Sequence, residues 1–513
     1  MALAQPVPWV AEQAGFYYID NTHPRATDQD RTFGTPLNPR RSIPVTLPPA
    51  SVVSVGGGPY LLPSGSSHTY GFEGTAQQPV FVRCSPGVRF EGGLPRGATI
   101  TFAGQYGVWE RCVFENIRTG AGPGAGLRYF SFRHNVIRNW SGSASTAMFS
   151  AGRNVPGGPV NEHIVIYDND IVRNTSISHA RERDTIGVVA STGSQDVWVV
   201  DNRLQSLGGD SVRTGTNPPA PEPRASHIYI GRNVMGSNGE NCVDVKQGRE
   251  VIISQNTCTD LAPSTGGNSS GEGIVVHYEA QRTWILFNTI QRVTRGIVAT
   301  AQDDLYIVGN VLRDIVHDPT VDHDFDPLQL QSGGTAVQVR GSTGELFIVN
   351  NTITASDRGI WIRQPNFRQV SAIEVVNNLV YGLTGAGSHY GWSAATLPDQ
   401  STFTHNLMKC GSGCIQIGTR RYDTLNSFRS AQGGCAGCVS ADPVWNAAET
   451  TILTLGEKSA ARDAGTDRSK VYERFRVLYG RSIAFDRVGN ARPQDRKWDI
   501  GAFEFTPVKP PRP

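Results

Sequence analysis

The chain has 513 residues, enough for several ordinary domains or for one long repetitive domain. Charged residues make up 18% and the formal net charge is +2, so no overall electrostatic field indicates binding to nucleic acid or to a membrane surface. A run of about 18 apolar residues, which a transmembrane helix needs, does not occur. Any anionic ligand must therefore be bound by local clusters of charge.

The N-terminal residues, MALAQPVPW, lack the basic and then apolar pattern of a signal peptide. The residues ALA before Gln5 nevertheless have the small-residue form of a cleavage site. We therefore expect an exported protein, secreted or periplasmic, whose signal peptide has been removed. A cytosolic protein that begins at this methionine is the alternative.

Eight cysteines, an even number, fit an oxidising compartment. Cys410 and Cys414 form a C-x3-C pair and Cys435 and Cys438 a C-x2-C pair, a spacing that zinc could use. The glycine-rich segments around them read as loops, so we favour disulfides over a zinc site. Four further cysteines are candidates for bridges or small core residues: Cys84, Cys112, Cys242 and Cys258.

One sequence motif recurs along the middle of the chain: an alternating apolar run, an asparagine, and a second short apolar run. Examples are VIYDNDIV, IYIGRNVM, VIISQNTC, LYIVGNVL and FIVNNTIT. Asn233 and Asn256 are 23 residues apart, and Asn288 and Asn310 are 22 apart. Short strands at this period, without helical segments between them, predict a parallel β-helix of about ten coils, with the asparagines bonded along the stack at a turn. The alternative is an antiparallel sandwich, which needs tight Asn-Gly or Asp-Gly hairpins that are almost absent.

Both ends of the chain resemble secreted right-handed β-helix proteins of the pectate-lyase-like superfamily. The segment FYYIDNTHPRATDQDRTFGTPLNPRRSIPVTLPPASVVSVGGGPY is similar to their opening segment, and SIAFDRVGNARPQDRKWDIGAFEF to their closing segment. The resemblance implies the fold and export, but no reaction, because this superfamily includes lyases, hydrolases, epimerases and phage tailspikes. We predict a cap at 1–75, a β-helix at 76–440 and a closing segment at 441–513.

Alignment of the strands that follow the asparagine turns indicates one functional face. The strands 210–213, 243–246, 274–277, 297–300, 337–340 and 360–363 end in one outward column: Arg213, Lys246, His277, Thr300, Arg340 and Arg363. Asp244 lies two residues before Lys246, so we expect both on the solvent side. Cations directly opposite one another destabilise a sheet, so three in succession favour a functional face over scattered surface charge.

A cleft lined with Arg, Lys and His suits a linear polyanion. We predict an acidic, uronic-acid-containing polysaccharide as substrate, cleaved by β-elimination, with Lys246 as base, His277 as acid or second base, and Arg213 clamping the carboxylate. The base must be neutral; a neighbouring cation would lower the Lys246 pKa, whereas Asp244 would raise it. Further candidate substrate-binding residues are Asp244, Tyr278, Glu279, Arg340, Trp361 and Arg363, with Trp284 as another aromatic platform. Insertions at 141–160, 175–184, 215–226, 262–271 and 317–334 could form the cleft walls.

The segment NCVDVK also resembles the lysine strand of the chondroitinase B and alginate lyase family. That resemblance implies the base role for Lys246. The next strand, GEGIVVHYE, carries His277 where that family has arginine, and Glu240 and Asn241 match its calcium-binding acidic residues only loosely.

Glycoside hydrolysis is the main alternative and needs two carboxyl groups about 5 to 9.5 Å apart. By register Asp244 and Glu279 are roughly 14 Å apart, too far for that role. Asp303, Asp304 or the acidic loop residues Asp322, Asp324 and Asp326 could supply the second carboxyl group. The same three loop residues are candidates for a calcium site. A uronate epimerase and a non-catalytic glycan binder remain further alternatives, and we expect a monomer.

Overall fold

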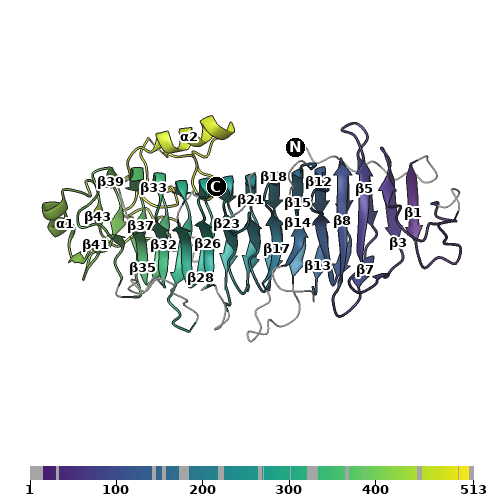
Figure 1. The fold of residues 1–513 in the computed structure, drawn as a ribbon. Helices are drawn as coiled ribbons and strands as arrows, with labels where there is room; N and C mark the ends of the chain where they lie inside the picture. The colour runs from purple at the N-terminus through teal and green to yellow at the C-terminus, as the bar shows by residue number, and fades with distance from the viewer. Residues whose placement is uncertain are drawn as a thin grey trace, which may run out of the picture. The chain divides into compact units, whose positions relative to one another are not determined.

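A computed structural model describes residues 15–29, 34–140, 146–152, 158–172, 184–217, 224–263, 269, 271–300, 302–320, 333–363, 369–385, 387–446, 453–494 and 496–507. The chain forms two compact units, 1–251 and 252–513, and each is described by itself. In both units short strands stack in parallel series, as Figure 1 shows. No helix among these described residues is long and apolar enough to cross a membrane.

Unit 1 contains three series of parallel strands, and the chain visits them in turn. The first series is β2 (Thr46–Leu47), β5 (Ser67–Glu73), β8 (Ala98–Gln105), β11 (Ile117–Ala121), β14 (Thr146–Ser150), β17 (Thr185–Ala190), β20 (Val212–Thr214) and β23 (Val243–Lys246). The second is β1 (Phe16–Asp20), β3 (Val52–Gly56), β6 (Val80–Cys84), β9 (Gly107–Glu110), β12 (Arg128–Arg133), β15 (Glu162–Tyr167), β18 (Gln195–Val200) and β21 (Ser226–Gly231). The third is β4 (Tyr60–Leu62), β7 (Arg89–Gly92), β10 (Val113–Glu115), β13 (Val136–Arg138), β16 (Asp170–Val172), β19 (Arg203–Gln205) and β22 (Val234–Gly236).

Unit 2 repeats this arrangement, and the chain enters it within β24 (Arg249–Ser254). Its first series is β26 (Glu272–His277), β29 (Arg295–Thr300), β32 (Thr335–Arg340), β35 (Arg358–Arg363), β38 (Tyr390–Trp392) and β41 (Ile415–Ile417), with β42 (Arg420–Tyr422) antiparallel at the end. The second is β27 (Gln281–Leu286), β30 (Asp303–Val308), β33 (Thr343–Val349), β36 (Val370–Val376) and β39 (Ser401–Thr404). The third is β25 (Thr257–Thr259), β28 (Thr289–Val293), β31 (Val311–Ile315), β34 (Thr352–Ser356), β37 (Leu379–Tyr381), β40 (Leu407–Met408) and β43 (Val439–Ser440).

The predicted parallel β-helix is therefore confirmed, with the right-handed connections expected of parallel strands. Among the described residues seven strands make up the third series in each unit, fourteen in all, whereas about ten coils were expected from the repeat. The repeat undercounts because the coils before Asn135 have no asparagine at the corresponding turn.

An asparagine ladder holds the turn between the second and third series, as the repeat predicts. In unit 1 the members are Asn135, Asn169, Asn202 and Asn233, and each is at most 2% exposed. Asn169 donates from its backbone N and from Nδ2 to Oδ1 of Asn202, at 2.9 Å in both cases. Unit 2 continues the pattern from Asn256 to Asn406. The buried amides of this ladder thus find partners on neighbouring coils.

The closing segment docks on unit 2. Helix α2 (Ser469–Tyr479) packs Val471, Tyr472 and Phe475 against the second series, while the short α1 (Leu425–Gln432) caps the last coils (Figure 1). Arg492 and Glu504 form a fully buried ion pair, with Nη1 2.6 Å from Oε1. The arginine and glutamate of the "R-P…DIGAFE" pattern therefore pair inside this segment.

Candidate active site

The candidate active site lies on the outward side of the first series in unit 1. Strands β17, β20 and β23 direct Val188, Val212 and Val243 inward, and all three are 0% exposed. β20 pairs with β23 so that Arg213 stands opposite Asp244. Because successive side chains on a strand point to opposite faces, Arg213 and Asp244 belong to one outward column.

This register corrects the predicted alignment, which placed Arg213 opposite Lys246. Gly215 occupies that position instead: a Cβ built on it would lie 1.7 Å from the backbone O of Lys246. Alternation could not reveal the difference, because a slip of two residues leaves every side chain on the same face.

The solvated environment predicted for Asp244 is also wrong. Asp244 is 3% exposed, and its Oδ2 lies 3.1 Å from Nζ of Lys246. The Lys246 side chain is 16% exposed. The face is outward in the strand pattern, yet Asp244 is buried on it beside the Lys246 ammonium.

Burial of the Lys246 ammonium would by itself lower its pKa, but the carboxylates of Asp244 and Asp210 outweigh burial and raise the pKa above its ordinary value. The opposing effects expected of a neighbouring cation and of Asp244 are both present, and the net shift is upward. Arg213 does oppose the shift, more weakly than the two aspartates. Lys246 is an ammonium at neutral pH.

Asp210 completes the pair of buried carboxyl groups. It is 0% exposed, and its Oδ1 accepts a hydrogen bond of 2.9 Å from Nδ2 of Asn241. Its Oδ2 is buried and has no hydrogen-bond partner among the described residues. Burial, followed by the nearby Asp244 charge, raises the Asp210 pKa well above that of an ordinary aspartate.

A third carboxylate, that of Asp184, precedes β17. Its Oδ2 lies 3.9 Å from Nη1 of Arg213. A Cβ on Gly209 would come within 2.2 Å of its Oδ1, so only glycine leaves room for Asp184 in this position. Asp184 also contributes to the raised pKa of Asp210. We call Asp184, Asp210 and Asp244 the aspartate cluster; its cations are Arg213 and Lys246.

A groove of about 260 Å³ leads along the same face to Arg213. It crosses β8, β11, β14 and β17, and polar side chains line much of it: Thr99, Thr101, Arg118, Thr146, Ser150 and Ser191. Hydroxyl groups and a guanidinium are suitable partners for the hydroxyl groups of a sugar chain.

Sequence reasoning missed Asp184 and Asp210. Asp184 precedes β17 and lay outside the aligned strands, whereas Asp210 began the aligned strand 210–213 at a position that alternation assigns to the inward face. In the structure β20 begins only at Val212, so Asp210 lies before the strand. A signal was present in the matching turns GGDSV and GENCV, because Ser211 N donates to Asn241 O and thereby places Asp210 beside Asn241.

The remaining predicted residues belong to unit 2, where their register is as predicted. Thr300 pairs with Arg340, and Arg340 with Arg363. The His277 ring stacks on Tyr278 with centroids 3.8 Å apart, and the chain turns at Tyr278 and Glu279 through left-handed backbone.

Of the two tryptophans predicted as platforms, Trp361 is half-buried and Trp284 is not available. The Trp361 ring lies against Gly391, where a Cβ would come within 2.1 Å, and the Arg358 guanidinium lies 5.1 Å from the ring centroid. Trp284 is 0% exposed because Phe475 of α2 packs on it.

The prediction of disulfides, which was favoured over a zinc site, is confirmed. Cys410 is bonded to Cys414, and Cys435 is bonded to Cys438. Cys84 and Cys112 form another bridge, and Cys242 and Cys258 are disulfide-bonded as well. The proposed calcium ligands Asp322, Asp324 and Asp326 lie outside the described residues.

The contact beneath Lys246 supports a stability prediction. Gly215→Ala adds a methyl group against the Lys246 carbonyl at a left-handed residue (φ +66°), whereas Gly87→Ala, also left-handed (φ +85°), meets no atom within 4 Å. Both variants bear the backbone cost, and we expect Gly215→Ala to cost about 2 kcal/mol more in free energy of unfolding. Urea unfolding measures the difference; equal losses in the two variants would contradict the close packing at Gly215.

No sequence family and no curated protein sequence matches the chain. Solved structures do match in part. The A-module of the mannuronan C-5 epimerase AlgE6 of Azotobacter vinelandii is 14% identical over 77% of this chain and 91% of its own, with a TM-score of 0.38. The pectate lyase Pel9A is 11% identical over 96% of this chain and 97% of its own, with a TM-score of 0.36. The alginate lyase AlyGC is 13% identical over 90% of this chain but only 57% of its own, with a TM-score of 0.41. The similarity assigns no activity to this chain.

Proposed function

We propose that the protein hydrolyses glycosidic bonds of a polysaccharide on the outward face of the first series in unit 1. The observation that carries the proposal is a pair of buried carboxyl groups in different environments. Asp210 has a raised pKa and an Oδ2 with no hydrogen-bond partner among the described residues, while Asp244 is held against the Lys246 ammonium. Two carboxyl groups whose surroundings differ in this way suit an acid and a charged partner.

In this mechanism Asp210 is the general acid. Its Oδ2 proton is transferred to the glycosidic oxygen as the bond to the anomeric carbon breaks. Asp244, whose negative charge Lys246 stabilises, assists at the anomeric carbon as nucleophile or as the base that activates water; the anomeric configuration of the product distinguishes the two. Water supplies the hydroxyl group of the new reducing end.

The pH profile should follow the charges around Asp210. An acid must be protonated to act, so activity is expected to fall as pH rises through the Asp210 pKa. Asp184→Asn removes a charge that raises this pKa and should move the alkaline limb to lower pH. Lys246→Met removes a charge that lowers it and should move the limb to higher pH. A kcat profile for each variant tests this; shifts of the same sign would contradict the assignment of the limb to Asp210.

β-Elimination from a uronate is the second candidate, because two cations, Arg213 and Lys246, lie at the cluster and could neutralise a substrate carboxylate. With Lys246 held as an ammonium, the proton at C5 would have to pass to Asp244. The roles predicted for His277, Tyr278, Glu279, Arg340, Trp361 and Arg363 stay predictions for either reaction.

We also propose that the protein works outside the cytosol and that its substrate is an acidic polysaccharide. The disulfides support the first statement, because such bonds persist in oxidising compartments. The cations at the cluster support the second.

Product chemistry tests the proposal. Incubation with a panel of uronic-acid and neutral polysaccharides should release new reducing ends without absorbance from an unsaturated uronate. Unsaturated products would favour the lyase reaction. Absence of product from every glycan would contradict both reactions and favour a non-catalytic glycan-binding protein.

A further inference from the structure

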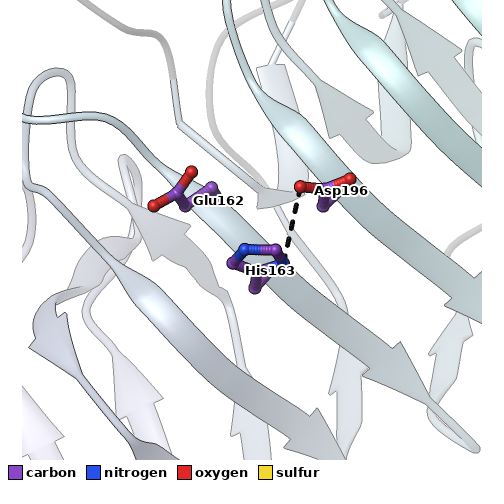
Figure 2. Close-up of side chains that lie close together, drawn as sticks. All are labelled: Glu162, His163 and Asp196. Atoms are coloured by element: carbon purple, nitrogen blue, oxygen red, sulfur yellow. Dashed lines mark ion pairs between the residues drawn. The ribbon is translucent and has the colours of Figure 1, made fainter. Parts of the chain in front are cut away.

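We propose that Glu162, His163 and Asp196 form a binding site for a divalent transition-metal ion such as Zn²⁺. The three residues lie on β15 and β18 of the second series in unit 1, away from the strands that carry the aspartate cluster. Figure 2 shows their side chains gathered together, with the His163 imidazole directed at the Asp196 carboxylate.

The backbone places these residues in register. Glu162 pairs with Gln195, and Gln195 with Ser226, so the residues that follow, His163, Asp196 and His227, occupy equivalent positions on three consecutive coils. All three have left-handed backbone, with φ between 53° and 54°. This shared turn brings imidazole, carboxylate and imidazole into one row.

The separations fit a metal better than a hydrogen bond. His163 Nδ1 lies 3.5 Å from Oδ2 of Asp196, and one ligand atom from each of Glu162, His163 and Asp196 lies within 4.8 Å of the others. A hydrogen bond between N and O is about 2.7 to 3.2 Å long. Ligands at about 2.0 to 2.2 Å around a tetrahedral ion are roughly 3.4 Å apart.

An ordinary His–Asp pair in the same unit provides the contrast. His134 Nδ1 and Asp168 Oδ2 are 2.9 Å apart, a normal hydrogen bond, and no third ligand group joins them among the described residues. Both histidines have left-handed backbone, so the two sites differ mainly in ligand number and spacing.

The neighbours of the three ligands would hold them in place. Tyr129 stacks on His163 with centroids 4.6 Å apart, and Gln195 donates from Nε2 to Oε2 of Glu162 at 2.5 Å. His227 Nδ1 lies 3.4 Å from the other Asp196 oxygen, Oδ1, where it can orient the carboxylate. Metal ligands commonly have such outer partners.

The solvent exposure of the three side chains and the type of their donor atoms indicate which class of metal ion the site would bind. The side chains of His163 and Asp196 are 29% and 25% exposed, so an ion can enter from solvent and keep a water ligand. An imidazole with carboxylates suits Zn²⁺ or similar ions, whereas Ca²⁺ and Mg²⁺ prefer oxygen ligands alone. By joining neighbouring coils, the ion would stabilise unit 1.

Calorimetric titration of the metal-free full chain with ZnCl₂ tests the proposal, with Co²⁺ absorption as a second readout of the ligand geometry. We expect one ion per chain, a rise in melting temperature, and loss of binding in His163→Asn and in Asp196→Asn. His227→Asn should weaken binding about 10- to 100-fold. Asparagine tolerates left-handed backbone, so each exchange keeps the local turn.

The matched control is His134→Asn, which removes a histidine from the ordinary pair and should bind Zn²⁺ as the unaltered chain does. Circular dichroism of each variant checks that the fold is kept. If Asp196→Asn does not fold, the test rests on His163→Asn, whose side chain is only partly buried. Absence of stoichiometric binding, or undiminished binding in His163→Asn, would overturn the proposal.

Discussion

Replacement of Asp210 by Asn is expected to lower kcat by about 10²- to 10⁴-fold, the usual contribution of a general acid. The amide has the same shape as the carboxyl group but cannot transfer the proton that the raised pKa of Asp210 retains. The side chain stays buried, and Asn carries no charge there, so the fold should be kept. Assay of kcat and KM on the substrate found in the glycan panel measures the effect.

Asp201→Asn is the matched control for this variant. It makes the same exchange in unit 1, at a solvent-accessible ion pair in which Asp201 Oδ1 accepts from Nε of Arg232 at 2.7 Å. Its kcat should equal that of the unaltered chain. A kcat in Asp210→Asn above one tenth of that value would contradict the role of Asp210 as acid.

Asn202→Asp should strongly destabilise unit 1, because it replaces a buried amide nitrogen by an oxygen. Nδ2 of Asn202 donates to the carbonyl of Ile166 at 2.9 Å and to Oδ1 of Asn233 at 3.0 Å, and a carboxylate would turn both contacts repulsive. Each lost partner in a buried site costs about 1 to 3 kcal/mol, so we expect a loss of about 4 kcal/mol in free energy of unfolding.

Asp201→Asn again serves as control, since it makes the reverse exchange at the adjacent residue. An exposed ion pair contributes less than about 1 kcal/mol, so its unfolding midpoint should move little. Urea unfolding of the two variants compares them directly. Similar midpoints would mean that the asparagine ladder does not stabilise the coils.

The fold could be predicted because each coil repeats the same sequence pattern. Each coil needs an inward row of apolar side chains and a turn at which a buried amide finds partners, so Asn169, Asn202 and Asn233 recur in a visible phrase. The opening coils were harder to see, since aromatic side chains such as Phe102 and Trp109 fill them and no ladder asparagine marks their turns.

The site could be predicted only in part, because period-two patterns assign a face but not a register. Arg213, Asp244 and Lys246 were placed on the correct face, yet Arg213 stands opposite Asp244, two residues from its expected partner Lys246. The pKa of Lys246 depends in part on Asp210, which the alignment assigned to an inward strand position but which the structure places before β20. Burial of Asp244, which is 3% exposed although it lies on the outward face, is likewise not described by alternation.

The most direct test of the central claim is cleavage of the active glycan in water enriched in ¹⁸O, followed by mass spectrometry of the products. Hydrolysis with Asp210 as acid predicts one ¹⁸O at the reducing end for each bond cleaved by the unaltered chain, and almost no product from Asp210→Asn. Unlabelled products with an unsaturated end, formed equally fast by Asp210→Asn, would contradict the account.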